Sequence, residues 1–158
     1  MTITIKKVAV TISDCAVALL FLSAIMIFSP FPEVSAAYPL FFFSLLAHEL
    51  GHASPVYKMC KGSIDITMEC FKGETYSAGV DPKSISAGKL VAFYVTGPAV
   101  GIGVSLLAFL VAMILGSAAV AIASIIIVAF HSGSLLPFKY TSDMSRLMRA
   151  LELLDGKK

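Results

Sequence analysis

The sequence His48-Glu49-Leu50-Gly51-His52 lies inside an apolar run, Tyr38–Tyr57. In a helix, residues four apart lie on one face, so His48 and His52 would be neighbours with Glu49 beside them. Two such imidazoles can hold one Zn²⁺, with the carboxylate placed to accept a proton from an activated water molecule. Ionisable groups inside a membrane span are costly and usually mark function. The alternative is a pair of histidines that only brace a helix bundle.

The composition indicates an integral membrane protein. Of the 158 residues, 58% are hydrophobic and 14% are charged, and a soluble domain of this size cannot bury so much apolar surface. Since one span needs about 20 mostly apolar residues, we expect an all-α polytopic membrane protein forming a single domain over residues 1–158. The sequence predicts four transmembrane helices: Val8–Phe28, Tyr38–Tyr57, Val91–Leu115 and Ala118–Phe138.

All the basic residues fall on one side of these predicted spans. Two precede the first span, five lie between the second and third, and five follow the fourth, which accounts for all 12. Cytoplasmic loops carry the excess of Lys and Arg, so both termini and the long middle loop are predicted to be cytoplasmic. Cys15 would then be membrane-embedded, and Cys60 and Cys70 would face a reducing compartment, so no disulfide is expected.

Residues 1–37 allow two interpretations. Lys6-Lys7, the apolar stretch that follows and the small residues Val34-Ser35-Ala36 have the outline of a cleavable signal peptide. The apolar stretch is long for a signal core, which favours an additional first transmembrane span. Cleavage before the second span stays open as the alternative, and it would leave the orientation of the other spans unchanged.

The middle loop contains a strand-like pattern. Apolar and polar residues alternate over Ile64–Phe71, Lys72-Gly73 offers a turn, and Glu74–Val80 could return as a second strand. The sequence therefore predicts a small cytoplasmic-side β-hairpin between the second and third spans. Such a hairpin could be a lid over the helix ends, or the strand Ile64–Phe71 could present an edge that pairs with an extended peptide.

Helix-breaking and small residues mark the two later spans. Gly97 and Gly101 form a G-x-x-x-G pattern that allows close helix approach. Gly133 and Pro137 are predicted to unwind the end of the fourth span, which would free backbone groups to line a polar cavity. Packing alone explains the pattern in the third span.

A catalytic zinc site takes three protein ligands and keeps one position open, so a third ligand must lie near the two histidines. The candidates are Asp14, His131, Asp143 and Asp155. His131 is expected to pack or to form hydrogen bonds rather than to bind metal. Asp143, with Ser142, could cap a short amphipathic surface helix and turn back toward the helix bundle.

Taken in order, these motifs resemble those of the site-2 protease family of intramembrane zinc metalloproteases, over about residues 38–151. HELGH matches the family's first motif in full, and Gly97-Pro98 matches the middle one. The last motif of the family is matched in outline by Ser134–Pro137 together with Ser142-Asp143.

The resemblance implies that His48, His52 and Asp143 bind Zn²⁺ and that Glu49 is the catalytic general base. It also implies that residues 38–151 are the catalytic core of a protease that cleaves peptide bonds in or near transmembrane segments. The partners expected are a transmembrane substrate protein or membrane peptide and the lipid bilayer, with no nucleic acid. We expect the membrane to be a prokaryotic cytoplasmic membrane, and the sequence gives no oligomeric state.

Three positions depart from the family pattern. Ser134 and Gly101 stand where Asn is usual, and Met144 stands where Gly normally follows the ligand Asp. These departures favour an alternative, a catalytically weak or inactive protease-like membrane scaffold that binds transmembrane partners. A metal transporter fits less well, because the chain has neither paired repeats nor polar residues along a path.

Overall fold

The structure is a computed structural model that describes residues 1–29, 32–78, 85–137 and 142–155, with residues 153–155 described by their backbone alone. Its elements in chain order are β1 (Thr2–Ile5), β2 (Val8–Ile12), α1 (Asp14–Met26), α2 (Pro32–Ser35), α3 (Ala37–Val56), β3 (Ile64–Met68), β4 (Gly73–Ser77), α4 (Ala87–Leu115), α5 (Ala118–Ser134) and α6 (Asp143–Asp155).

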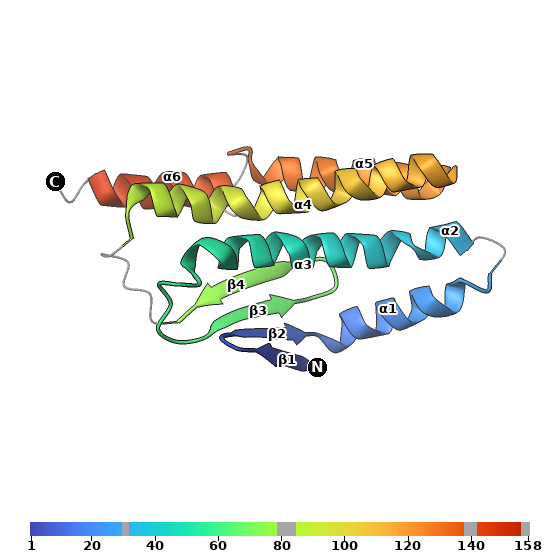
Figure 1. The fold of residues 1–158 in the computed structure, drawn as a ribbon, viewed down its shortest axis with the longest axis horizontal. Coiled ribbons are helices and arrows are strands. Elements are labelled where there is room, and N and C mark those ends of the chain that lie inside the picture. Colours follow the sequence, from blue (N-terminus) through green and yellow to red (C-terminus); the bar gives the residue numbers. More distant parts are fainter. Residues whose placement is uncertain (30–31, 79–84, 138–141, 156–158) are drawn as a thin grey trace.

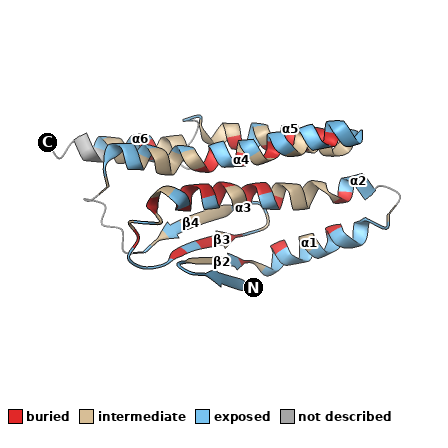
Figure 2. Ribbon diagram, in the orientation of Figure 1, coloured by how far each residue is buried: buried red, intermediate tan, exposed pale blue. Residues whose placement is uncertain are grey.

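Helix α3 lies in the middle of the molecule (Figure 1). The sheet lies on one side of it, and α4, α5 and α6 lie on the other. Buried residues gather on α3 and β3, while the outer surfaces of α1, α4 and α5 are largely exposed (Figure 2). The histidine-containing helix is thus covered on two sides.

The four strands form one sheet in the order β1-β2-β3-β4. The pairs β1–β2 and β3–β4 are antiparallel, and β2 runs parallel to β3. One face of β3 is fully buried, with Ile64, Ile66 and Met68 each 0% exposed, and it packs in one core with Phe42 and Leu45 of α3. The predicted hairpin is confirmed as β3–β4. The prediction that Ile64–Phe71 offers a free edge is wrong, because β3 is paired on both sides.

The prediction of a first span over Val8–Phe28 is wrong in its N-terminal part. Val8–Ile12 is a strand, joined to β1 by a turn in which Lys6 has φ 55°. Ser13 then caps α1 by accepting a hydrogen bond from the backbone N–H of Ala16. The alternating β-branched residues of Thr2–Ile5 and Val8–Ile12 favour strands. The fold is therefore mainly helical with a four-stranded sheet, and it is not all-α.

Two of the predicted spans have the length and composition of membrane-crossing helices. The helical stretch of residues 32–56, which includes α3, meets both conditions. Helix α4, with 29 residues, also meets them. Helices α1 and α5 are apolar but shorter, with 13 and 17 residues, and 13 residues reach only about 20 Å of a roughly 30 Å hydrocarbon core. The four predicted spans are thus supported in part.

The outer surfaces of α4 and α5 carry large apolar side chains. Among those exposed are Leu106, Leu107, Leu110, Met113, Ile114, Leu115, Ile122, Ile125, Ile126 and Phe130. So many exposed large apolar side chains on two helices are suited to lipid or a protein partner rather than water. Together with the two long apolar helices, they indicate a membrane protein.

The prediction that no disulfide forms is wrong for Cys15 and Cys70. These two residues are joined by a disulfide, with their Cα atoms 5.7 Å apart, whereas Cys60 is free and buried. Cys15 follows β2, which runs parallel to β3, and Cys70 follows β3, so the two strands end side by side. The disulfide therefore connects the start of α1 with the turn between β3 and β4.

Candidate metal centre

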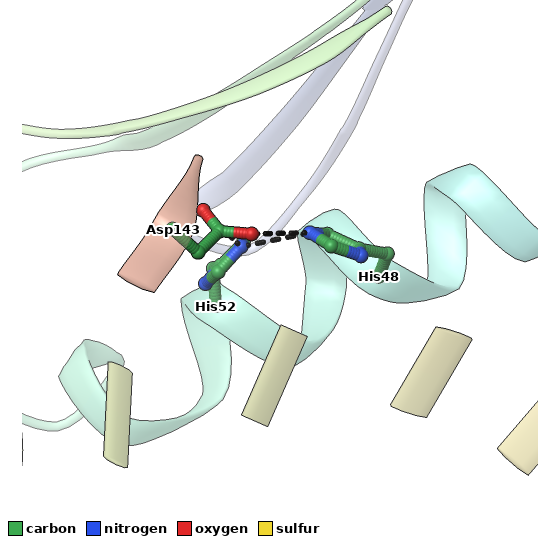
Figure 3. A group of neighbouring side chains, drawn as sticks. All are labelled: His48, His52 and Asp143. Carbon is green, nitrogen blue, oxygen red and sulfur yellow. Dashed lines mark hydrogen bonds and ion pairs between the residues drawn. The ribbon is translucent and has the colours of Figure 1, made fainter. Parts of the chain in front are cut away.

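His48 and His52 face each other one turn apart on α3, as the spacing predicts (Figure 3). Both side chains are buried, and their Nε2 atoms lie 3.0 Å apart. Helix α4 lies close against this turn, since a Cβ placed on Gly51 would come within 2.9 Å of the Cα of Gly97. The expected close helix approach at Gly97 is therefore seen, and it places α4 beside the histidines.

Asp143 comes to the same point from α6. It is the first residue of that helix, which Ser142 caps by accepting a hydrogen bond from the Ser145 N–H at 3.2 Å. The Asp143 carboxylate oxygens lie 3.3 Å from His48 Nε2 and 3.5 Å from His52 Nε2. Burial alone would raise the pKa of Asp143, but the two neighbouring imidazoles outweigh it and hold this pKa below its usual range. The two carboxylate oxygens of Asp143 each face one of the two histidines.

The three donor groups have the geometry of a metal site. Tetrahedral zinc with bonds of about 2.0–2.1 Å places neighbouring ligand atoms roughly 3.3 Å apart. The three distances here are 3.0, 3.3 and 3.5 Å, and each residue offers one ligand atom within 4.8 Å of the others. The donor set also suits the ion, because imidazole nitrogen and carboxylate oxygen are common zinc ligands.

Further hydrogen bonds orient both histidines. His52 Nδ1 lies 2.6 Å from the backbone carbonyl of Phe93, which can only accept, so in the neutral ring Nδ1 donates and Nε2 keeps its lone pair. His48 Nδ1 lies 3.0 Å from Nδ1 of His131. The interpretation of His131 as a hydrogen-bonding residue is confirmed. Such outer partners fix the tautomer of a metal-binding histidine.

Of the other two candidates for a third ligand, Asp14 does not join this group. Asp14 is exposed in the first turn of α1. The side chain of Asp155 lies outside the described residues. The expectation that Asp155 does not bind zinc therefore stays a prediction.

Glu49 is buried beside the histidines and is held by β4. Its carboxylate Oε2 accepts a hydrogen bond from the Thr75 hydroxyl at 2.7 Å, and its backbone carbonyl accepts one from the same hydroxyl at 3.1 Å. A Cβ on Gly73 would lie 2.6 Å from Glu49 Cγ, so β4 packs directly on this side chain. Thr75 was not predicted from the sequence, although it lies in Glu74–Val80, the segment expected to return as the second strand.

The three donor groups and Glu49 all line one cavity of about 740 Å³. It is lined from α3, β4, α4, α5 and α6, by His48, Glu49, His52, Thr75, Tyr94, Ser134, Asp143 and Arg146 among others. The Ser134 hydroxyl donates to the backbone carbonyl of His131 at 2.7 Å.

A second carboxylate, Glu74, also lines the cavity, but it is already engaged. Lys72 Nζ lies 2.5 Å from Glu74 Oε1, and the Tyr76 hydroxyl donates to the same carboxylate. Lys72 first and Tyr76 second lower the pKa of Glu74. Among the described residues, Glu49 forms no ion pair, so its carboxylate is the one beside the three donor groups that no cation engages.

Comparison with known proteins finds a similar fold but no similar sequence. No protein-family profile and no curated protein matches the chain. Among solved structures, it is similar to one described as a Site-2 Protease from Methanocaldococcus jannaschii, with a TM-score of 0.58 and 16% identity over 96% of this chain and 71% of the other. At this identity the similarity shows the fold, which is site-2-protease-like.

Proposed function

We propose that this protein is an intramembrane zinc metalloprotease that hydrolyses peptide bonds in or near transmembrane segments of other proteins. One observation carries the proposal: His48, His52 and Asp143 converge with near-tetrahedral ligand spacing in the cavity that also contains Glu49. The site-2-protease-like fold supports it. We further propose that the protein lies in a prokaryotic cytoplasmic membrane. The distribution of basic residues favours cytoplasmic termini, whereas the Cys15–Cys70 disulfide favours an oxidising compartment on the side of the sheet.

In this proposal the three converging groups hold the metal and Glu49 moves the proton. Zinc, when bound, activates water and polarises the scissile carbonyl. Glu49 accepts the proton of the attacking water and then delivers it to the amine of the leaving peptide. The Thr75 hydroxyl, bonded to Glu49 Oε2, holds the carboxylate in one orientation and leaves Oε1 for this proton transfer.

A transmembrane substrate must be unwound before hydrolysis, since the peptide carbonyls of a helix are hydrogen-bonded within the helix. We propose that the free edge of β4 receives the unwound segment. The bonds Ala78 N–H to Ser63 O and Glu69 N–H to Lys72 O fix the antiparallel ladder between β3 and β4. Because ladder bonds alternate, Gly73, Thr75 and Ser77 point their N–H and C=O groups away from β3. That edge borders the cavity, and it could hold an extended peptide beside Glu49.

The direct test compares cleavage and zinc content in the purified wild type and Glu49→Gln. The probe is a set of synthetic single-span peptides in detergent micelles, with products identified by mass spectrometry. We expect the wild type to cleave at least one peptide and Glu49→Gln to cleave none while keeping its zinc, since only the proton acceptor is lost. Glu74→Gln is the matched control and should stay active. Equal cleavage by Glu49→Gln and the wild type would refute the proposal.

A second candidate function is a protease-like scaffold that binds transmembrane partners without cutting them. The Ser134 hydroxyl favours it, because this group already donates within its own helix and does not take the place of the usual Asn as a free donor. The scaffold predicts that no peptide is cleaved by the wild type or by Glu49→Gln, and that both proteins bind the peptides equally.

A further inference from the structure

A buried hydrogen-bonded chain behind His48 connects α3, α4 and α5. His48 Nδ1 lies 3.0 Å from His131 Nδ1, and His131 Nε2 lies 2.8 Å from the Ser44 hydroxyl. The hydroxyls of Ser44 and Ser105 are 2.8 Å apart, and Ser105 donates to the Gly101 carbonyl at 2.8 Å. Ser44, Ser105 and His131 are each 0% exposed, so the chain is closed off from water.

One polarity of this chain keeps the lone pair of His48 Nε2 for a metal. The Gly101 carbonyl can only accept, and when it accepts the Ser105 proton, Ser44 donates toward Ser105 or toward the same carbonyl, 3.2 Å away. Ser44 then accepts from His131 Nε2–H. The Nδ1 of His131 therefore carries the lone pair, and it accepts from His48 Nδ1–H. As a result, the lone pair of His48 Nε2 points to Asp143 and His52.

Room for the His131 ring comes from Gly101. A Cβ on Gly101 would lie 2.8 Å from three ring atoms of His131, namely Cε1, Nδ1 and Nε2. The ring also stacks on His48, with centroids 4.9 Å apart and an interplanar angle of 27°. The imidazole thus occupies the place that a side chain at position 101 would otherwise fill.

We propose that His131 is a positioning residue that fixes the tautomer and orientation of His48 for metal binding, and that Gly101 is the residue that makes this possible. The inference rests on the proposed zinc site. His131 itself does not bind the metal, because both of its nitrogens are engaged elsewhere. An apolar ring of similar size could pack here, but it could not accept the Nδ1–H of His48.

The test measures zinc affinity, by competition with a chromophoric chelator, and the visible spectrum of the cobalt-substituted protein. His131→Ala should weaken zinc binding by about 10–100-fold, as loss of an outer-shell partner typically does, and should alter the cobalt spectrum. His131→Asn should recover most of the affinity, because its amide oxygen can accept from His48 Nδ1–H. A packing role alone would not distinguish these two variants.

Gly101→Ala gives independent support, since it displaces the ring without removing a polar group, and it should weaken zinc binding in the same way. Its matched control is Gly103→Ala on the same helix, because a Cβ there would meet no described atom within 4 Å. The metal-free melting temperature identifies variants that fail to fold.

If folded His131→Ala and Gly101→Ala both show the zinc affinity and the cobalt spectrum of the wild type, the inference is overturned. The proposed function would remain intact. Zinc binding by His131→Asn as weak as that of His131→Ala would also overturn it. If the wild type binds no zinc, both the inference and the proposed function fail.

Discussion

The contact between Gly73 and Glu49 predicts the effect of adding one methyl group to β4. In Gly73→Ala, the new Cβ would lie 2.6 Å from Cγ, 2.8 Å from Oε1 and 3.0 Å from Cδ of Glu49. Carbon atoms pack at about 3.5 Å or more, so Glu49 must move by about 0.9 Å. A displacement of roughly 1 Å in a reacting group can lower the rate by about 10²-fold. We therefore expect cleavage to fall about 100-fold.

The assay follows initial rates on a cleaved synthetic transmembrane peptide, with zinc content measured on the same samples. Gly73→Ala should keep its zinc, since the three atoms nearest to the new Cβ all belong to Glu49 and none to a proposed zinc ligand. Gly88→Ala is the control, because a Cβ there would meet no described atom within 4 Å, and it should cleave at the wild-type rate. A wild-type rate in Gly73→Ala would refute the reasoning that the packing of β4 holds Glu49 in its working position.

Three further predictions concern the third ligand, the sheet edge and the topology. Asp143→Ala should lose zinc and activity together, whereas Asp155→Ala should keep both; the opposite result, by metal analysis and cleavage, would transfer the ligand role. Ser77→Pro removes an outward N–H without breaking a bond to β3, so peptide cleavage should fall with zinc retained, and unchanged cleavage would reduce β4 to a lid. A membrane-impermeant thiol reagent should label Lys72→Cys only from the cytoplasm and Glu33→Cys only from the opposite side, and labelling of Lys72→Cys from outside would overturn the predicted topology.

The central part of the site could be predicted because its information is local. The spacing of His48 and His52 fixes their common face once the run is helical, and the helix Ala37–Val56 follows from its apolar composition. The approach of Asp143 was less local. It depended on Pro137 after α5 and on a cap at Ser142, whereas Gly133 lies within α5. The structure does place the carboxylate beside both histidines.

The N-terminal strands were missed because hydropathy alone cannot separate a short buried strand from the start of a span. Val8–Ile12 is apolar enough to extend a predicted helix, but its pairing with β3 is a long-range contact that no local pattern reveals. The disulfide between Cys15 and Cys70 was missed for the same reason, since it depends on where β2 and β3 end.

The roles of His131 and Gly101 could not be derived from the sequence. A lone histidine in an apolar helix shows no partner, and Gly101 was explained by helix packing alone. Only the crossing of α3, α4 and α5 brings Ser44 and Ser105 within hydrogen-bonding distance of that ring and of each other.

The zinc content of the purified protein tests the central claim most directly. The measurement is metal analysis of the wild type and of His48→Ala after identical purification, with Asp14→Ala as an exposed carboxylate control. The account predicts about one zinc ion per chain in the wild type and in Asp14→Ala, and a large loss in His48→Ala, because two ligands hold zinc far more weakly than three. Equal zinc content in His48→Ala and the wild type would contradict the account.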